Sequence, residues 1–395
     1  MKILIIINGL GYSKKAPIGG SDKRAVELAR QLTSIKGCEV TILTTSPGKH
    51  MFLENEGLRS VDYIVTDASK FADSVRVRET MLGRLWAYIE LTFASAKHIF
   101  PATYDVVYAS SDFFCDLLPA VQIGKSRGSL LVCFVHHRIP SPFGREGSFL
   151  KNCGVYALQN FSFWVIKRFF NLCLVYDTPE GAAIEHNLKN LVSVARVFNG
   201  IAAKTIDDTD SKDCEDNLFF DACYVGGVRP SKGIPDLINF WRIVAEGSTR
   251  RLGIIGGGLE QQVAVVEELI RDAKMEDNIV FLGPRSQRET FAIMKQSKYF
   301  ISLSYEEGWG MAVYEALYAG KYCFVHNLPA YQRIQPFLVS VDVGSYKDLV
   351  ASFINHEAGG LVVNVAGHEF VRKYSWESVA LAEYNLFCIN KEALK

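Results

Sequence analysis

The chain has 395 residues, of which 49% are hydrophobic and 22% charged, with a formal net charge of zero. This length exceeds one typical domain and suits two, each with a substantial core. The balanced charge argues against a nucleic-acid-binding protein. The nine cysteines are scattered and form no C-x-x-C pair, which argues against a disulfide framework or a zinc site. No apolar stretch reaches the length of a bilayer span.

The N-terminal part of the chain has the pattern of an α/β fold. Lys2 to Ile7 is a β-branched run typical of a buried parallel strand rather than a signal peptide, and the cysteine usage favours the cytoplasm. After a loop that ends at Gly20, apolar residues recur at helical spacing from Ala25 to Leu32, with Ser21 or Asp22 as the N-cap. This order predicts the start of a doubly wound domain, which continues with strands at Val40–Thr44, Val106–Tyr108, Leu130–Val135, Leu172–Tyr176 and Val192–Phe198.

Two histidines follow one of these strands. His136 and His137 come directly after Val135, so either can point into a ligand cleft and handle protons near neutral pH. The alternative is a histidine that caps the strand or packs on the helix layer.

An acidic segment divides the chain. Residues 202–217 hold six Asp and Glu and predict a solvated linker. Asp208-Thr209-Asp210 imitates the DxD of metal-dependent glycosyltransferases, but no strand precedes it, so we expect no metal site. We therefore predict domains at 1–200 and 218–374, a linker at 201–217 and a terminal helical segment at 375–395. Lys and Arg exceed Asp and Glu in residues 1–200, and the reverse holds in 201–395, as expected for two domains with different partners.

The second half repeats the α/β pattern, and two of its strands lead into glycine turns. Its strands are predicted at Ala222–Val225, Leu252–Ile255, Ile279–Leu282, Tyr299–Leu303 and Tyr322–Val325. The loop Gly226 to Gly233 lets the backbone approach a phosphate, with Lys232 as a mobile positive charge. The alternative is a turn with solvent-facing Arg229 and Lys232. Gly256-Gly257-Gly258 fails the dinucleotide fingerprint, because Gln261 stands where the third glycine belongs.

The segment from Tyr305 to Ala316 is the most informative. Glu307 would lie in the loop at a strand's carboxyl end, and Glu315 about two turns into the next helix. Gly308 and Gly310 allow close backbone approach, and the helix start offers N–H groups to an anion. Two carboxylates around an amide-lined phosphate site suit a nucleotide sugar. The alternative is an ordinary α/β crossover with solvated acidic residues.

This segment resembles the E-x7-E motif of GT-B glycosyltransferases of family four, which are retaining enzymes. The resemblance implies an α/β fold of two Rossmann-like doubly wound domains facing a cleft, with the final helix, from Trp376 to Phe387, crossing back to the first domain. The N-terminal domain would hold the acceptor and the C-terminal domain an NDP-sugar, with no other cofactor. The acceptor would be a glycan or a lipid-linked molecule.

The resemblance also implies roles for individual residues. Lys232 matches the lysine that grips the donor diphosphate, whereas the family's arginine falls at Gly227, where Arg229 could replace it. Glu307 would hold the donor sugar and Glu315 the ribose. His136, or else His137, would contact the donor sugar. Backbone around further residues would line the donor site: Gly19, Gly20, Gly257, Gly310 and Met311. Arg333 stands where many relatives carry an acidic residue. A sugar-nucleotide epimerase and a catalytically silent nucleotide-sugar-binding protein remain alternatives.

Basic and aromatic residues interleave from Arg138 to Phe170. Such a segment suits the surface of an anionic bilayer, which would make the protein peripheral on the inner face of the membrane. The alternative is a helix whose aromatic residues, Trp164 among them, belong to the core.

Overall fold

The computed structural model describes residues 1–9, 18–69, 81–98, 103–125, 128–144, 149–214, 219–360 and 363–394. These residues form two compact units. Unit 1 holds the described residues of 1–198 and of 376–395, and unit 2 holds those of 199–375. The C-terminal segment therefore belongs with the N-terminal unit.

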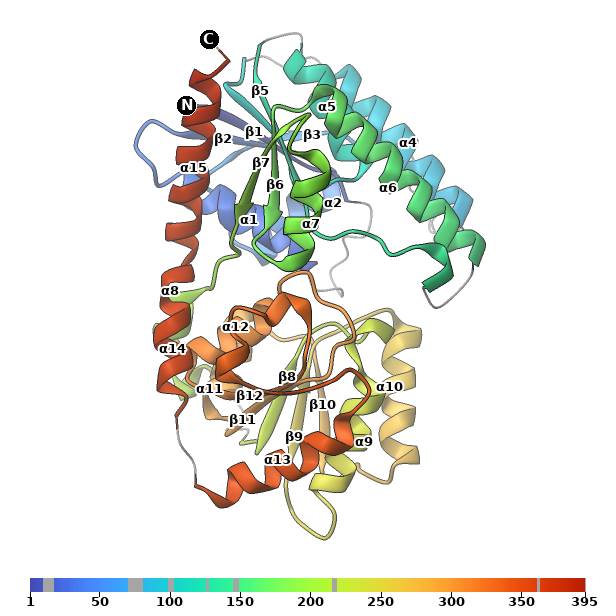
Figure 1. Ribbon diagram of the computed structural model, residues 1–395, viewed down its shortest axis with the longest axis vertical. Helices are drawn as coiled ribbons and strands as arrows, with labels where there is room; N and C mark the ends of the chain where they lie inside the picture. The colour runs from blue at the N-terminus through green and yellow to red at the C-terminus, as the bar shows by residue number, and fades with distance from the viewer. Residues whose placement is uncertain are drawn as a thin grey trace. The chain divides into compact units, whose positions relative to one another are not determined.

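Unit 1 is built on a seven-stranded parallel sheet with the order β3-β2-β1-β4-β5-β6-β7 (Figure 1). Its central strands carry continuous apolar runs, because helices cover both faces of such a sheet. The strands are β1 (Lys2–Ile7), β2 (Glu39–Thr44), β3 (Asp62–Val65), β4 (Val106–Ala109), β5 (Leu130–Val135), β6 (Leu172–Tyr176) and β7 (Ser193–Val197).

The helices of unit 1 form two groups. One contains α1 (Gly20–Leu32) and α15 (Trp376–Glu392), which pack together. In the other, α4 (Met81–Lys97) and α6 (Phe149–Phe169) both pack on α5 (Phe114–Lys125). The remaining helical segments are α2 (Ser46–His50), the π-helical η1 (Met51–Asn55), η2 (Pro142–Gly144) and α7 (Pro179–Leu188).

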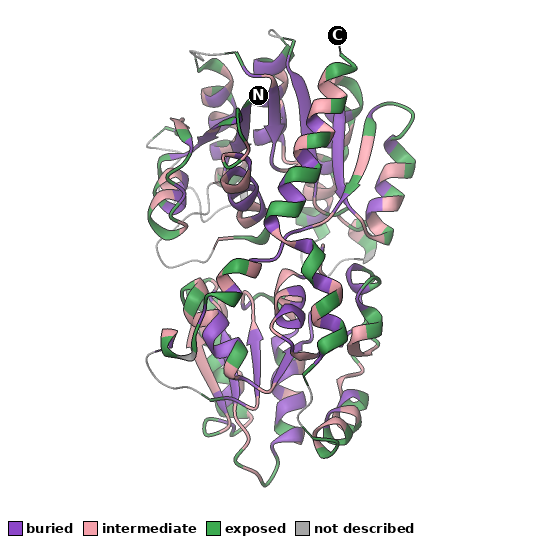
Figure 2. Cartoon of the chain, turned by 90° about the vertical axis from the view of Figure 1, so that its left-hand side faces the viewer, coloured by how far each residue is buried: buried purple, intermediate pink, exposed green. Residues whose placement is uncertain are grey.

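Unit 2 has a six-stranded parallel sheet with the order β10-β9-β8-β11-β12-β13. The strands are β8 (Ala222–Val225), β9 (Leu252–Ile255), β10 (Ile279–Gly283), β11 (Tyr299–Ser302), β12 (Tyr322–His326) and β13 (Leu338–Val341). In both sheets the central strands are buried (Figure 2).

The longer helices of unit 2 are α9 (Ile234–Val244), α10 (Glu260–Asp272), α11 (Gln287–Gln296), α12 (Met311–Tyr318) and α13 (Tyr346–Ala358). Shorter segments are α8 (Ala203–Asp207), η3 (Ser211–Asp213), η4 (Pro230–Lys232), η5 (Pro329–Tyr331), η6 (Gln335–Phe337), α14 (Val365–Val371) and η7 (Arg372–Tyr374). Trp241 of α9 and Phe353 of α13 meet edge to face in the core, with 5.9 Å between ring centroids.

The acidic segment differs from the solvated linker that the sequence predicts. Residues 201–214 form α8 and η3, while 215–218 lie outside the described residues. Lys295 Nζ donates to the carbonyl oxygens of Ile206 (3.0 Å) and Thr209 (2.7 Å), and Tyr318 donates to Asp207 Oδ2 (2.8 Å). The segment is therefore part of unit 2, because its backbone and carboxylates find partners there that composition does not reveal.

Two edge strands are missing from the sequence prediction. Neither β3 nor β13 has a fully buried residue, and each carries a polar residue, Asp62 or Ser340. An edge strand is covered less than a central one, so it lacks the apolar run that reveals the others. The N-cap of α1 is also different: it is Gly19, and Ser21 and Asp22 lie in the first turn.

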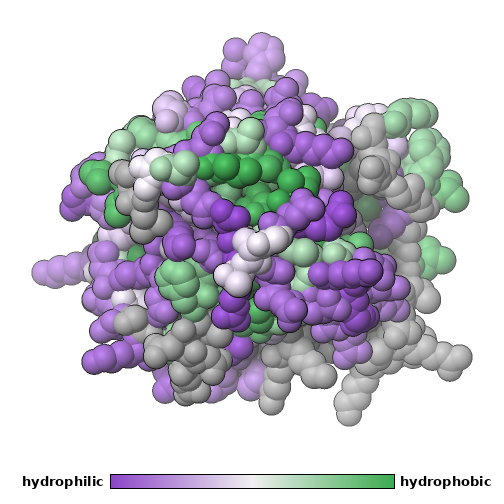
Figure 3. Space-filling model, turned by 90° about the horizontal axis from the view of Figure 1, so that it is seen from below, coloured by the Kyte–Doolittle hydropathy of each residue, from purple (hydrophilic) through white to green (hydrophobic). Residues whose placement is uncertain are grey.

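The surface has an ordinary polar character on the face drawn in Figure 3, where hydrophobic side chains gather in separate places among hydrophilic ones. No helix in the described ranges is long and apolar enough to cross a bilayer.

A buried ion pair joins α1 to α15. Arg24 and Glu383 are almost completely buried, and the guanidinium donates to one carboxylate oxygen. Arg24 also donates to the Tyr108 hydroxyl (3.1 Å) and lies 4.0 Å from the centroid of the Phe134 ring. The pair therefore connects the C-terminal helix to the core of unit 1.

We predict that Glu383→Leu lowers the free energy of unfolding by about 3–5 kcal/mol, because it leaves the Arg24 charge buried without its partner. The double variant Arg24→Met/Glu383→Leu should recover most of this loss, since no isolated charge remains. Urea unfolding followed by circular dichroism measures both. Equal stability of wild type and Glu383→Leu would contradict this account of the pair.

Candidate functional site

The candidate site lies where the strand order of unit 2 reverses. Strand β8 pairs with β9 on one side and β11 on the other, so their chain connections run in opposite directions. The loops after β8 and β11 therefore meet at the carboxyl edge of the sheet, where open α/β sheets bind ligands. These loops carry the two strongest sequence motifs.

Lys232 and Glu307 form an ion pair between these loops. Lys232 Nζ lies 2.7 Å from Glu307 Oε1, and both side chains are about 15% exposed. The loops also touch through their backbones, because Tyr305 N donates to the Ser231 carbonyl (2.9 Å). The lysine and glutamate that the sequence places 75 residues apart are thus direct partners.

Gly233 makes this arrangement possible. Its φ is 63°, and a Cβ at this position would lie 1.8 Å from the carbonyl oxygen of Leu303. Only glycine allows both the left-handed conformation and this close approach. The contact fixes the loop that carries Lys232 against the end of β11.

The glycine turn after β9 belongs to the same edge. Val228 N donates to the Gly257 carbonyl (3.1 Å), and Gly226 N donates to the Ile255 carbonyl (3.0 Å). A Cβ at Gly256 would lie 1.8 Å from the Gly226 carbonyl oxygen, so the two loops pack backbone to backbone. Gly226 and Gly256 therefore provide the backbone clearance that this packing needs.

Arg229 lies close to Gly227, where the family's arginine would stand. Its Nε is 3.5 Å from the position that a Cβ on Gly227 would take, which is an ordinary contact distance. Tyr224, buried below the loop, donates to the Gly227 carbonyl (3.0 Å) and fixes its direction. The exposed guanidinium of Arg229 therefore lies beside Gly227, the position at which the family has its arginine.

Helix α12 begins at the far end of the β11 loop. Gly310 is its N-cap with φ 83°, and a Cβ there would come 2.4 Å from the Tyr331 ring. Met311 is its first residue, so the backbone of Gly310 and Met311 forms the helix start. Glu315 lies in the second turn and is half-buried. Arg333 is exposed just after η5.

The sequence reasoning missed His326, the last residue of β12. It is completely buried; its Nε2 accepts from Gly344 N (3.3 Å), so its Nδ1 carries the proton and donates to the Ser304 carbonyl (3.2 Å). Its ring stacks on Tyr305, with 5.9 Å between centroids. Burial lowers the pKa of His326, which favours the neutral form. The imidazole supports the loop that carries Glu307; its position at a strand's carboxyl end was the only signal in the sequence.

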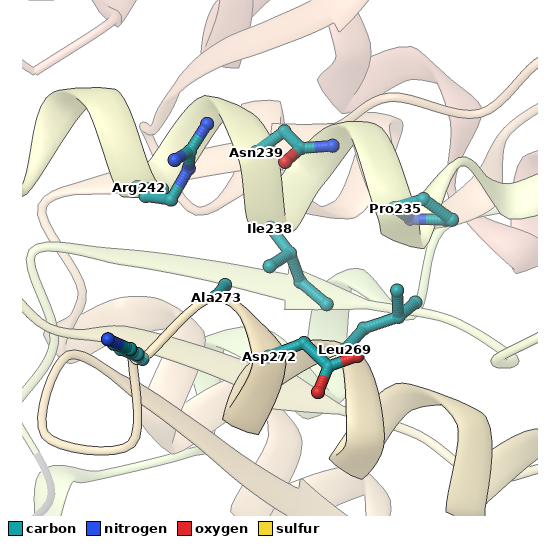
Figure 4. A pocket seen from close by; sticks show the side chains of 8 residues that line it. Pro235, Ile238, Asn239, Arg242, Leu269, Asp272 and Ala273 are labelled. Atoms are coloured by element: carbon teal, nitrogen blue, oxygen red, sulfur yellow. The ribbon is translucent and has the colours of Figure 1, made fainter.

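A separate hollow of about 450 Å³ lies between α9 and α10 (Figure 4). Ile238 and Leu269 point toward each other in it, and Arg242, Asp272 and Lys274 line its rim. It contains no residue of the predicted site and lies along helices, away from the strand ends.

In unit 1, His136 is held by two hydrogen bonds. Its Nε2 lies 2.9 Å from the Ser110 carbonyl oxygen, which can only accept, so Nδ1 accepts from the Tyr176 hydroxyl (3.2 Å). Burial, with the nearby positive charge of Arg24, lowers the pKa of His136 to about 3. The ring is therefore neutral at physiological pH, which suits hydrogen bonding better than proton release. His137 beside it is exposed.

The strand order of unit 1 reverses between β1 and β4. Gly19 and Gly20 lie at the start of α1, after a loop whose residues 10–17 are outside the described part. The sequence reasoning missed Asp116 at this edge, which accepts from Asn8 N (2.9 Å) and the Ser111 hydroxyl (2.5 Å). Burial raises the pKa of Asp116 to about 7.

The described ranges offer no metal site. They contain no group of three or more His, Cys, Asp or Glu side chains arranged to hold a metal ion. Asp208 ends α8, and Thr209 of the DxD-like sequence is buried and donates to the Thr205 carbonyl (2.6 Å).

Comparison with known proteins agrees with this geometry. Residues 212–335 match the family described as "Glycosyl transferases group 1", a range that contains every predicted donor residue of unit 2. The matched segment is less than half of the chain, whereas the fold as a whole is the two-domain α/β fold of solved GT-B glycosyltransferases. The predicted fold class is therefore confirmed, and the matched segment agrees with the predicted family.

Two curated relatives match over part of the chain. Both are GDP-mannose:cellobiosyl-diphosphopolyprenol alpha-mannosyltransferases. The one from Xanthomonas oryzae pv. oryzae is 26% identical over 136 residues, which are 33% of this chain and 36% of the relative. The one from Xanthomonas campestris is 30% identical over 84 residues, or 21% and 22% of the two chains. The matches thus span well under two thirds of either relative.

Solved structures match the chain over nearly its whole length. The sucrose-phosphate synthase from Thermosynechococcus elongatus has a TM-score of 0.76 at 16% identity, with 99% of each chain covered. The Anabaena protein HepE in complex with UDP and glucose has a TM-score of 0.70 at 14% identity, with 98% of this chain and 99% of that chain covered. At such identities these likenesses establish the fold.

We predict that Gly233→Ala abolishes donor binding or folding of unit 2, because the new Cβ would collide with the Leu303 carbonyl. Gly247→Ala is the matched control: its φ is 65°, but its Cβ would meet nothing within 4 Å. The control should lose only about 1–2 kcal/mol of stability, the cost of the left-handed conformation. Thermal unfolding with and without nucleotide measures both variants. Similar behaviour of the two would show that the contact with Leu303 does not constrain the site.

Proposed function

We propose that this protein transfers a glycosyl group from an NDP-sugar to an acceptor hydroxyl, with retention at the anomeric carbon and without a divalent metal. The observation that carries the proposal is the Lys232–Glu307 pair at the reversal of strand order, framed by glycine backbone and by the start of α12. A lysine, free amides and two glutamates are the groups that a diphosphate with a sugar at each end requires.

Each group has a role in this proposal. Lys232 and Arg229 stabilise the leaving diphosphate, where negative charge develops. An ammonium has three hydrogens, so Lys232 can contact phosphate while it keeps its bond to Glu307. Glu307 binds hydroxyls of the donor sugar, and Glu315 binds the ribose diol. Neutral His136 has both ring nitrogens in hydrogen bonds, with the Ser110 carbonyl and the Tyr176 hydroxyl, and does not transfer a proton.

For the acceptor we propose a glycan or a lipid-linked molecule. Support comes from the names of the two Xanthomonas relatives, which specify a diphosphopolyprenol acceptor. For the donor, the same names specify GDP-mannose, whereas HepE was solved with UDP and glucose. Both kinds of donor have the diphosphate and ribose that the proposed site would bind.

Thermal-shift screening against UDP-, GDP- and ADP-sugars tests the proposal first, because a ligand that binds only the folded state raises its apparent stability. The nucleotide sugar with the largest shift should then be consumed when acceptors are added, and NMR of the product should show the donor's anomeric configuration. Donor binding without turnover against any acceptor would favour a silent binding protein. Release of an isomerised nucleotide sugar without acceptor would favour an epimerase.

We predict that Glu307→Ala lowers kcat by about 100-fold or more, because sugar orientation counts most in the transition state. Glu315→Ala should instead raise the KM for donor about 10- to 100-fold, the cost of a lost hydrogen bond to a charged group. Glu306→Ala is the matched control, since Glu306 is the exposed neighbour of Glu307. Steady-state kinetics separate these effects. A folded Glu307→Ala protein with wild-type turnover would refute the role of Glu307.

We predict that transfer persists in EDTA, because Lys232, Arg229 and the helix start offset the diphosphate charge. Initial rates with EDTA and with added magnesium or manganese measure this. Activity that is lost on chelation and restored by metal would assign a metal site to the chain.

A further inference from the structure

Unit 1 carries an unusual set of exposed aromatic side chains on α4, η2 and α6. We name it the α4–α6 face; its large apolar members are Leu82, Trp86, Phe93, Phe143, Phe149, Leu150, Phe161 and Trp164, all exposed. Both helices pack on α5 and run along the same flank of unit 1 (Figure 1). Among the described residues, four of the five exposed phenylalanines lie on this face.

The large exposed apolar residues of α4 form one stripe. Leu82, Trp86, Phe93 and Lys97 recur at intervals of four and seven residues, which places them on one side of a helix. The opposite side, with Ala87, Leu91 and Ser95, is buried. Helix α4 therefore has a satisfied core face and a second apolar face that points to solvent.

Helix α6 repeats this arrangement. Four exposed residues of α6 are separated by steps of three or four residues or by sums of such steps, so they lie on one side of the helix: Leu150, Phe161, Trp164 and Arg168. Val165 and Ile166 on its other side are buried in the core of unit 1. The alternative that Trp164 is a core residue is therefore excluded: its side chain is 57% exposed.

The charges around these stripes are almost all positive. Helix α6 contains Lys151, Lys167 and Arg168 and no acidic residue. Helix α4 contains Glu90, whose carboxylate accepts from Trp86 Nε1 (2.7 Å) and Ser69 N (3.1 Å). Arg145 and Glu146, which lie between η2 and α6, are outside the described residues.

The tryptophans give a second, independent indication. Trp241, Trp309 and Trp376 are buried, whereas Trp86 and Trp164 are both more than half exposed and both lie on the α4–α6 face. Tryptophan beside lysine and arginine is the composition of membrane–water interfaces, where the ring is partly buried among acyl chains and the cations meet lipid phosphates.

From these observations we propose that the α4–α6 face binds the surface of an anionic bilayer. Phe143, Phe161, Trp86 and Trp164 enter the interfacial layer, while Lys151, Lys167 and Arg168 contact anionic headgroups. A bilayer fits better than a protein partner, because the aromatic residues lie on two separate helices that share one sign of charge and almost no acidic group. This inference goes beyond glycosyl transfer and adds α4 to the segment that the sequence indicates.

Sedimentation with vesicles of phosphatidylglycerol and phosphatidylcholine tests the proposal. The protein should sediment with anionic vesicles at low salt, bind neutral vesicles at least tenfold more weakly, and be released as salt rises through the physiological range. The emission of Trp86 and Trp164 should shift to shorter wavelength on binding. In Trp86→Phe/Trp164→Phe the shift should vanish, because the other three tryptophans are buried.

Variants separate this surface from others. Phe161→Ser/Trp164→Ser and Lys167→Glu/Arg168→Glu should each weaken vesicle binding at least tenfold with unchanged circular dichroism. The matched control is Leu381→Ser/Ile389→Ser, which removes two exposed apolar residues from α15; its binding should equal that of wild type.

Three outcomes would overturn the proposal: equal, negligible sedimentation with anionic and neutral vesicles at low salt, an unchanged affinity in both α4–α6 variants, or an oligomer in solution that these variants dissociate while vesicle binding stays absent. The result is independent of the proposed function. Glu307→Ala should keep full vesicle binding, and the α4–α6 variants should keep the thermal shift with nucleotide sugar.

Discussion

The candidate site depends on one backbone contact, the approach of Gly233 to the carbonyl group of Leu303. This contact exists because β8 and β11 are neighbours in the sheet although they lie far apart in the chain. A side chain at residue 233 would push the two loops apart, and Lys232 would then no longer reach Glu307. The same principle holds for Gly256 against Gly226 on the other side of β8. The binding edge is thus assembled from backbone surfaces that only glycine permits to touch.

Charge at this edge is balanced before any ligand arrives. The ammonium of Lys232 and the carboxylate of Glu307 are both largely buried, and each lowers the cost of desolvating the other. Around them, buried groups hold the loops without adding charge: Tyr224 donates to the Gly227 carbonyl, and neutral His326 bridges Ser304 and Gly344. In the proposed function, such a site receives a dianionic diphosphate with little rearrangement, as electrostatic stabilisation of a leaving group requires.

In unit 1 a charged pair is part of the core. Arg24 and Glu383 connect the first helix to the last, and Arg24 also lies near the ring of His136, whose pKa it helps to lower. The terminal helix α15 is therefore more than a cover of apolar surface. It supplies the carboxylate that allows an arginine to remain charged beside the end of β5. The outer helices α4 and α6 have the opposite character, since they keep large apolar side chains in solvent.

The sequence by itself determined the central strands of both sheets and the fold class, and it singled out the loops that carry Lys232 and Glu307. Buried parallel strands are continuous apolar runs, and glycine turns and Glu307 are local in the chain, so each leaves a signal within a few residues. Only the tertiary structure decided which of these groups are partners. The sequence could not show that Lys232 pairs with Glu307, that Glu383 neutralises Arg24, or that His136 is neutral, because each depends on side chains brought together from distant segments. Nor could it show that 201–214 pack on unit 2, that β3 and β13 complete the sheets, or that Trp164 is exposed. Burial is a property of the assembled layers, and a polar edge strand or an aromatic surface helix has no local pattern that distinguishes it from a loop or a core helix.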